Sequence, residues 1–331
     1  MITGVAGFIG SHAADALLSS PGNRVIGLDS LVYSGRLQNL PTKKENFCFI
    51  KCDISNSVQV NTALTHAKRF FSNEPYAVIN FAAESHVDRS IQSGIPFVQT
   101  NVLGTQILLE FSAKLGAEKF LQVSTDEVYG SLIKGSATET LQLNPSSPYA
   151  ASKASADLLA LAFFHTHGFP ITITRCVNNF GSRQLNEKLI PRFMYLASKN
   201  MDLPLYGTGQ NIREWIPVSL HVNRILDVLT KGESGQIYNI GTDFRLSNFE
   251  IAEIILANFE TESRIMYIED RLGHDVRYAV NSQKGIDLFN WGSSQNIKAE
   301  LEETMRFYWG IYKKMDSENL KKVEEVESFY N

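Results

Sequence analysis

The sequence predicts an α/β fold in which a doubly wound parallel sheet carries a smaller α/β lobe at its C-terminal end. Two observations predict the sheet. Short apolar runs alternate with amphipathic stretches through the first half of the chain, and a glycine-rich turn stands where a first strand would meet a first helix. Parallel strands need crossover connections, which helices supply. A third observation, the change to shorter elements after about Arg183, predicts the second lobe.

The first half of the chain is expected to alternate strands with helices. Apolar runs of strand length are found at residues 24–28, 47–52, 77–81, 119–123 and 171–175. Stretches with helical spacing of apolar residues lie between them, at residues 9–19, 58–71, 97–115 and 149–166. Because the two kinds of element alternate, helices should cover both faces of the sheet.

The second half is expected to form the smaller lobe. Its strands are expected at residues 203–206, 236–239 and 264–267, and its helices at residues 219–230, 248–258 and 297–312. We therefore divide the chain into domains at residues 1–183 and 184–331, with some exchange of chain between the lobes. The charged tail at residues 321–331 is expected to be loosely held.

Composition excludes several classes of protein. The chain has 331 residues, of which 44% are hydrophobic and 20% charged, so it is neither disordered nor fibrous. A formal net charge of -4 argues against a surface that binds nucleic acid. No apolar run approaches the length that spans a membrane, and no leader segment is recognised, so we expect a cytoplasmic protein with no membrane partner.

The cysteines predict neither a disulfide nor a metal site. Cys48, Cys52 and Cys176 are odd in number, form no Cys-x-x-Cys pair and have no neighbouring cluster of histidines. We expect reduced, buried thiols and no bound metal.

A glycine-rich turn opens the chain and predicts a dinucleotide site. Gly4, Gly7 and Gly10 would allow a tight turn, the approach of a pyrophosphate to backbone N–H groups and close packing of helix on strand. Asp29 ends the next expected strand, where a carboxylate can accept the ribose hydroxyls of NAD and would repel the 2′-phosphate of NADP. The pattern is typical of Rossmann-type sheets, although a plain strand-to-helix turn also fits the glycines alone. Few residues precede Gly4, so the first strand should be short.

Tyr149 and Lys153 predict a proton-transfer pair. Ser147 and Pro148 are typical of a helix start, and residues four apart on a helix share a face. We expect the Lys153 ammonium, together with a nicotinamide cation, to lower the pKa of Tyr149 toward the range of a general base. An ordinary helix surface would also fit this spacing taken alone.

A threonine followed by two acids ends the strand expected at residues 119–123. Residues just past the carboxyl ends of parallel strands face the ligand crevice, and Thr125, Asp126 and Glu127 occupy that place. In extended chain the two acids would point to opposite sides, so both can face one substrate only if the chain turns, which Gly130 favours. We interpret them as an acid and a base, with a solvated loop as the alternative.

These motifs resemble those of the extended short-chain dehydrogenases and, within them, the dTDP-glucose 4,6-dehydratases. The similarity runs nearly end to end, through GVAGFIGSH, FAAESHVDRSI, TNVLGT, STDEVYG, SPYAASKA, NNFG, EKLIPRF, LPLYGTGQNIREW, IYNIGT and DRLGHDVRYA. The acid pair after Thr125 separates this family from related epimerases and decarboxylases.

The resemblance implies a redox-neutral reaction with tightly bound NAD. Tyr149 would take the proton of the sugar 4-hydroxyl, with Thr125 hydrogen-bonded to the same oxygen, while hydride passes to NAD. Glu127 would then remove the C5 proton as Asp126 protonates the departing 6-hydroxyl, and hydride would return to C6. The product would be a 4-keto-6-deoxy sugar.

The resemblance also implies binding residues. Besides Gly4, Gly7, Gly10, Asp29, Tyr149 and Lys153, the cofactor would contact Phe8, Ile9, Ser30, Leu31, Asp53, Ile54, Phe81, Ala82, Ala83, Thr100 and Asn179. The nucleoside-diphosphate glucose would contact Ser85, Thr125, Asn178, Lys188, Leu189, Pro204, Tyr206, Arg213, Asn248, Arg271 and His274. Arg213 and Arg271 suit a diphosphate as fixed cations.

The chain departs from the family pattern near the expected nucleotide and adenosine ends. Ser30 replaces a usual lysine, Val177 a usual serine and Leu272 a usual proline, and PVSLH stands at 217–221 in place of YVEDH. A UDP-glucose dehydratase, a UDP-sugar 4-epimerase or decarboxylase, and a catalytically idle NAD-binding sensor therefore stay open as alternatives. By analogy with relatives, we expect a homodimer formed through the helices at residues 97–115 and 149–166.

Overall fold

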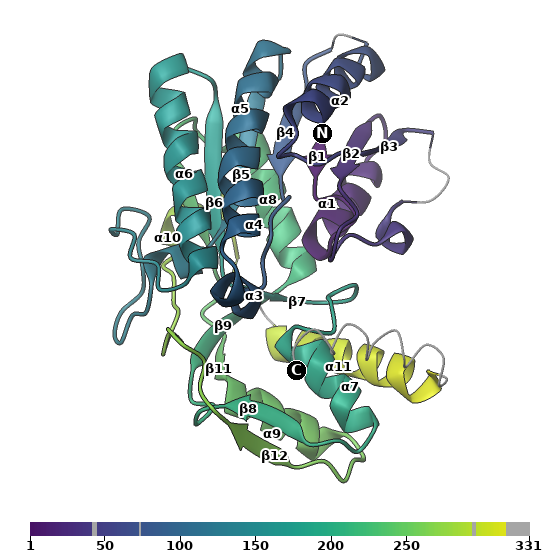
Figure 1. Ribbon diagram of the computed structural model, residues 1–331, viewed down its shortest axis with the longest axis vertical. Helices are drawn as coiled ribbons and strands as arrows, with labels where there is room; N and C mark the ends of the chain where they lie inside the picture. Colours follow the sequence, from purple (N-terminus) through teal and green to yellow (C-terminus); the bar gives the residue numbers. More distant parts are fainter. Residues whose placement is uncertain (42–44, 73, 293–295, 316–331) are drawn as a thin grey trace.

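A parallel sheet forms the centre of the protein. The computed structural model describes residues 1–41, 45–72, 74–292 and 296–315, and within them a seven-stranded sheet has the order β10-β6-β5-β4-β1-β2-β3 (Figure 1). Every neighbouring pair in it is parallel, as expected. The strands are β1 (Ile2–Thr3), β2 (Val25–Asp29), β3 (Phe47–Lys51), β4 (Ala77–Asn80), β5 (Lys119–Thr125), β6 (Ile171–Cys176) and β10 (Ile237–Ile240).

Helices cover both faces of this sheet. α1 (Phe8–Leu18) packs beside α8 (Val218–Lys231) on one face, and α2 (Ser57–Phe70), α5 (Gly104–Lys114) and α6 (Pro148–His167) cover the other (Figure 1). Neighbouring strand residues point to opposite faces, so an unbroken apolar run buries both. Thus Leu121 packs in the core beneath α1 and α8, while Phe120 packs beneath α2, α5 and α6. The doubly wound prediction is confirmed.

The helix expected at residues 97–115 is interrupted. It forms as α4 (Ile95–Phe97), a π-helical segment at Val98–Leu103 and α5. π-helical turns are frequent at functional sites. Here the segment carries Thr100, which lines a cavity, and the buried Asn101.

The second part of the molecule lies beyond the carboxyl ends of the strands (Figure 1). A three-stranded sheet contains β7 (Asn178–Phe180), β9 (Ile212–Pro217) and β11 (Arg245–Ser247), and β8 (Leu203–Tyr206) pairs with β12 (Ile265–Ile268). The helices α7 (Leu189–Ser198), α9 (Asn248–Asn258) and α11 (Ile297–Lys314) share one apolar core. Sequence analysis did not anticipate β7, β9, β11 or α7.

One strand expected in the second lobe belongs to the first. The strand predicted at residues 236–239 forms as β10, but it pairs with β6 at the edge of the seven-stranded sheet. Its helix α8 likewise packs on α1. A boundary at residue 183 therefore does not separate the two sheets cleanly, and the domain division stays a prediction. The tail expected at residues 321–331 lies outside the described residues.

Three smaller expectations concern membranes and thiols. None of the helices in the described part of the chain has the length and apolar character that a membrane crossing requires. All three thiols are free. Cys52 and Cys176 are buried, but Cys48 is only half-buried, which corrects the expectation for that residue.

Candidate active site

Two adjoining cavities open at the carboxyl ends of the parallel strands. The larger, of about 360 Å³, is lined by the segments that follow β1, β2, β4, β5 and β6 and by α6. The smaller, of about 190 Å³, lies against β8 and the start of α7. Glu127, Asn178 and Lys188 line both. One continuous site therefore runs from the sheet into the second part of the molecule.

The glycine turn leaves no room for side chains at its key positions. Gly4 has φ +65°, and a Cβ there would lie 2.8 Å from the Ala82 nitrogen. A Cβ on Gly10 would lie 2.2 Å from the Gly4 oxygen, so helix and turn pack backbone to backbone. α1 begins after Gly7 without a hydrogen bond from a capping side chain. The N–H groups of its first turn can therefore bind an anionic group in the cavity.

Asp29 lies at the end of β2 with its carboxylate in the larger cavity. It accepts hydrogen bonds from the backbone nitrogens of Ala6, at 2.9 Å, and of Leu31, at 2.8 Å. Burial raises the pKa of the Asp29 carboxyl, and these two hydrogen bonds oppose that shift. A carboxylate has about four acceptor positions, so it can still accept hydrogen bonds from a ligand hydroxyl.

The chain turns directly after Thr125. β5 ends there and a short 3₁₀ helix, Asp126–Tyr129, follows. The Thr125 hydroxyl accepts a hydrogen bond from the Glu127 nitrogen at 3.3 Å and donates one to Asp126 Oδ1 at 3.2 Å. Gly130 closes the turn at φ +73°, where a Cβ would lie 2.1 Å from the Asn144 oxygen. The turn brings both carboxyl groups into the same cavity.

The neighbouring charges shift the carboxyl pKa values of Asp126 and Glu127 differently. Burial raises the pKa of Asp126 well above its ordinary value, and the charges of Glu127 and Glu214 raise it further. Burial also raises the pKa of Glu127, but the cations of Arg213, Lys188 and Arg271 oppose the shift. Asp126 is therefore the group that keeps its proton more strongly.

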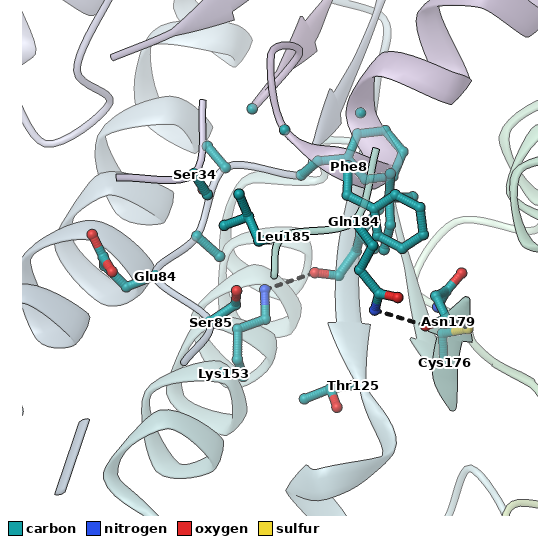
Figure 2. A pocket seen from close by; sticks show the side chains of 18 of the residues that line it. Phe8, Ser34, Glu84, Ser85, Thr125, Lys153, Cys176, Asn179, Gln184 and Leu185 are labelled. Atoms are coloured by element: carbon teal, nitrogen blue, oxygen red, sulfur yellow. Dashed lines mark hydrogen bonds between the residues drawn. The ribbon is translucent and has the colours of Figure 1, made fainter. Parts of the chain in front are cut away.

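Tyr149 and Lys153 stand one turn apart on α6. Ser147 caps this helix by accepting a hydrogen bond from the Ala150 nitrogen at 3.1 Å, and Pro148 follows it. The Lys153 ammonium donates to the Val123 carbonyl at 2.7 Å, across to β5 (Figure 2). Burial lowers the pKa of Lys153 to about 8, and the Asp157 carboxylate opposes that shift.

Within the protein alone, burial dominates the pKa of Tyr149. Burial raises the pKa of the Tyr149 hydroxyl, the charge of Glu127 raises it further, and a hydrogen bond with the Thr125 side chain opposes these effects. The ammonium of Lys153 is directed at the backbone of β5 instead. The protein alone therefore does not make Tyr149 a ready base, and a positive charge from a ligand would have to do so.

Nearly all the expected cofactor residues line the larger cavity. Leu31 does not line it, although its backbone nitrogen donates a hydrogen bond to the Asp29 carboxylate. The others that line the cavity are Gly4, Gly7, Phe8, Ile9, Gly10, Asp29, Ser30, Asp53, Ile54, Phe81, Ala82, Ala83, Thr100, Tyr149, Lys153 and Asn179.

The expected substrate residues line one or both cavities. Thr125 lies in the larger. Ser85, Asn178, Lys188 and Leu189 lie in both, and Pro204, Tyr206, Arg213, Asn248, Arg271 and His274 lie in the smaller.

The two arginines expected to bind a diphosphate are already held by the protein. Arg271 forms a two-point ion pair with Asp88, with Nε 2.5 Å from Oδ1 and Nη2 2.9 Å from Oδ2. Arg213 donates to the carbonyl oxygens of Ile212 and Asp275, each at 2.9 Å. Both cations are thus fixed beside the smaller cavity.

Sequence analysis missed several polar residues of the site. Glu84 and Glu187 line the larger cavity, and Arg192, Asp275 and Tyr278 line the smaller. Glu187, Arg192, Asp275 and Tyr278 lie within two of the motifs already recognised, EKLIPRF and DRLGHDVRYA. Their position in those motifs was the signal that could have found them. Within the described residues, no group of three side chains is arranged to hold a metal ion.

Comparison with known proteins shows the family. The family model described as GDP-mannose 4,6 dehydratase matches residues 1–304. A dTDP-glucose 4,6-dehydratase from Streptomyces griseus is 46% identical, with 93% of each chain covered. The low-salt glycan biosynthesis protein Agl12 of Haloferax volcanii is 43% identical, covering 94% of this chain and 98% of the relative.

A solved structure is similar over the same range. The dTDP-glucose 4,6-dehydratase DesIV from Streptomyces venezuelae, determined with NAD bound, matches with a TM-score of 0.85 and 41% sequence identity, covering 93% of this chain and 95% of that one. The motifs, the two cavities and these similarities agree, and the chain belongs to the nucleotide-sugar 4,6-dehydratase family.

Proposed function

We propose that this protein is an NAD-dependent hydro-lyase that converts dTDP-glucose to dTDP-4-keto-6-deoxyglucose and water. The observation that carries the proposal is the turn after β5. It places Asp126 and Glu127, with carboxyl pKa values shifted to different extents, in the cavity that Tyr149 and Lys153 also line. Hydride transfer alone would not need this acid pair, whereas loss of water needs both an acid and a base.

The larger cavity fits a dinucleotide. The glycine turn excludes side chains where a pyrophosphate would approach, the first turn of α1 offers N–H groups, and Asp29 offers acceptors for ribose hydroxyls. When bound there, NAD supplies a hydride acceptor for C4, a hydride donor for C6 and a positive charge near Tyr149.

The protein's own groups then move the protons. Tyr149 takes the proton of the 4-hydroxyl, and Thr125 hydrogen-bonds the same oxygen. The ketone at C4 acidifies C5, and Glu127 removes the C5 proton. Asp126, which keeps its proton because burial and two neighbouring carboxylates raise its pKa, gives that proton to the departing 6-hydroxyl. One water leaves, and the proton that Glu127 removed returns to C5 as C6 takes back the hydride, so the sugar ends as a 4-keto-6-deoxy compound.

A comparison of substrates tests the proposal. The purified protein is incubated separately with dTDP-glucose, UDP-glucose and GDP-mannose, and the alkali-sensitive absorbance of a 4-keto sugar is followed. We expect the fastest formation with dTDP-glucose. Galactose isomers without keto sugar would favour an epimerase, and bound NAD without turnover on any of the three would favour the sensor; either result would contradict the proposal.

We also propose a homodimer formed through the α5 and α6 side of the molecule. Four apolar side chains are exposed on adjacent elements there: Ile95 and Val98 are 68% and 56% exposed, and Leu103 and Leu158 are 48% and 58% exposed. Exposed apolar patches favour protein contacts. Sedimentation should give a dimer, and Leu158→Glu should shift it toward monomer; an unchanged mass would contradict this interface. The cytoplasmic location stays a prediction.

A further inference from the structure

Tyr33 and Arg89 form a cation–π pair between two segments of the chain that line the larger cavity. The guanidinium carbon of Arg89 lies 3.8 Å from the centroid of the Tyr33 ring, well within the range of about 6 Å for this interaction. Arg89 Nη1 also lies 3.4 Å from Glu84 Oε2. Tyr33 follows β2, whereas Glu84 and Arg89 follow β4. The three residues therefore join two segments that are distant in the sequence.

Both joined segments line the larger cavity. Ser30, Val32 and Ser34 contribute from the segment after β2, and Ala83 and Glu84 from the segment after β4. Ser34 and Glu84 lie on the same side of the cavity, opposite Asn179 and Cys176 (Figure 2). The contact between Tyr33 and Arg89 thus spans one wall of the cavity, on the side where Asp29 lies.

The segment after β2 has a backbone that needs support. Leu31 and Tyr33 have φ values of 57° and 44°, in the left-handed region that is unfavourable for residues with a Cβ. Such conformations persist only where surrounding contacts hold them. On the inner side, the Leu31 nitrogen bonds to Asp29 and the Gly35 nitrogen to the Val32 oxygen, at 3.1 Å. On the outer side, the ring of Tyr33 stacks on Arg89.

The other half of the contact stands on a firmly held element. Arg89 lies in the first turn of α3 (Val87–Gln92), which His86 caps by accepting a hydrogen bond from the Arg89 nitrogen at 3.4 Å. The neighbouring Asp88 ties the same helix to Arg271 in the second part of the molecule. If the segment after β2 opened, α3 would stay in place and the contact between Tyr33 and Arg89 would break.

We propose that Tyr33, Arg89 and Glu84 form a clasp that closes the dinucleotide cavity and slows the release of NAD. These are positioning residues, which act on the segment from Ser30 to Ser34 and not on the reacting atoms. The inference rests on the proposed function. In a redox-neutral cycle the same cofactor must stay between removal and return of hydride, because its escape would strand an oxidised sugar.

The rate of NAD release tests the clasp directly. The full-length protein is loaded with radiolabelled NAD, chased with unlabelled NAD, and sampled for retained label. Arg89→Ala and Tyr33→Ala should each release NAD about tenfold faster, in line with the strength of a partly exposed cation–π pair. Tyr33→Phe, which keeps the ring face, should restore slow release. The double variant should release NAD no faster than Arg89→Ala, because removal of Arg89 already abolishes the stack.

A matched control removes a comparable ion pair elsewhere. Arg306, on α11, lies 3.7 Å from Glu302 and far from the clasp in sequence, and Arg306→Ala should release NAD at the wild-type rate. Thermal unfolding of each variant checks that it is folded. If Arg89→Ala does not fold, the comparison of Tyr33→Ala with Tyr33→Phe tests the clasp.

The outcomes separate the clasp from the proposed function. Wild-type release rates in both alanine variants, together with normal dehydration, would overturn the clasp and leave the function standing. A wild-type protein that binds no NAD would overturn both. Faster release in Tyr33→Phe as well as Tyr33→Ala would also contradict the stacking argument.

Discussion

Replacing Glu127 by glutamine should separate the two halves of the proposed reaction. Glu127 lines both cavities, and the substitution removes its ability to take a proton while keeping its size. A positioned general base contributes roughly 10²- to 10⁴-fold to a rate, so elimination should slow by about that factor. This corresponds to a barrier higher by about 3–5 kcal/mol.

The first half of the reaction should survive the same substitution. The negative charge of Glu127 raises the pKa of both Tyr149 and Asp126, so its removal lowers both values. Proton transfer from the 4-hydroxyl to Tyr149 should therefore become no slower. Oxidation at C4 then outruns elimination, and the reduced cofactor accumulates during the reaction.

Rapid mixing with dTDP-glucose measures both halves at once. The near-ultraviolet absorbance of reduced nicotinamide should rise and persist in Glu127→Gln, while 4-keto-6-deoxy product forms slowly. Glu118→Gln, a substitution of an exposed acid, serves as the control and should behave as wild type. Wild-type dehydration in Glu127→Gln would refute its role as the base. Absence of any reduced nicotinamide would refute the separation of the two halves.

Other predictions concern the elements that support the site. Ser147→Ala removes the cap of α6 and should lower the free energy of unfolding by about 1 kcal/mol, measured by denaturant titration. Arg175→Met leaves the buried Asp157 carboxylate, 2.9 Å away, without its cation and should cost about 3–5 kcal/mol, much of it recovered when Asp157→Leu is added; no recovery would contradict this account. Burial lowers the pKa of Lys153 to about 8 from 10.5, so between these pH values the unfolded chain holds the proton that the folded protein has lost, and stability from this group should rise with pH. Over the same range kcat/KM should fall as the ammonium is lost, and a flat profile would contradict a role for its charge.

The central sheet could be predicted because its evidence is local. In Val25–Asp29 every residue is buried and only the last carries a charge, which is the pattern of a strand covered on both faces. The turn after Thr125 could be inferred because two adjacent acids at a strand end can face one substrate only if the chain turns, and Gly130 favours a turn there. β10 was placed in the wrong lobe because its own residues specify a strand but not its partner, and β6 lies far away in the sequence.

The contacts that modify the site were beyond sequence reasoning for a related reason. Arg271 pairs with Asp88, and Tyr33 stacks on Arg89. The partners are far apart in the sequence, and no periodicity or motif predicts that they meet. The pKa of Tyr149 was expected to fall through Lys153, which shares its helix face, together with a nicotinamide cation. Burial outweighs that proximity, and spacing along a helix does not show how far a hydroxyl is buried.

The roles of the two acids follow from where the fold places other charges. Asp126 sits next to Glu127 and near Glu214, so a negative charge on Asp126 would be the third in a buried setting. Glu127 faces the side of Arg213, Lys188 and Arg271, where a negative charge is stabilised. If the roles were exchanged, Glu127 would have to keep a proton beside cations, and Asp126 would have to carry a negative charge beside carboxylates. The arrangement therefore favours Asp126 as the acid and Glu127 as the base, and the same cations that favour the charge on Glu127 border the cavity expected to hold the diphosphate.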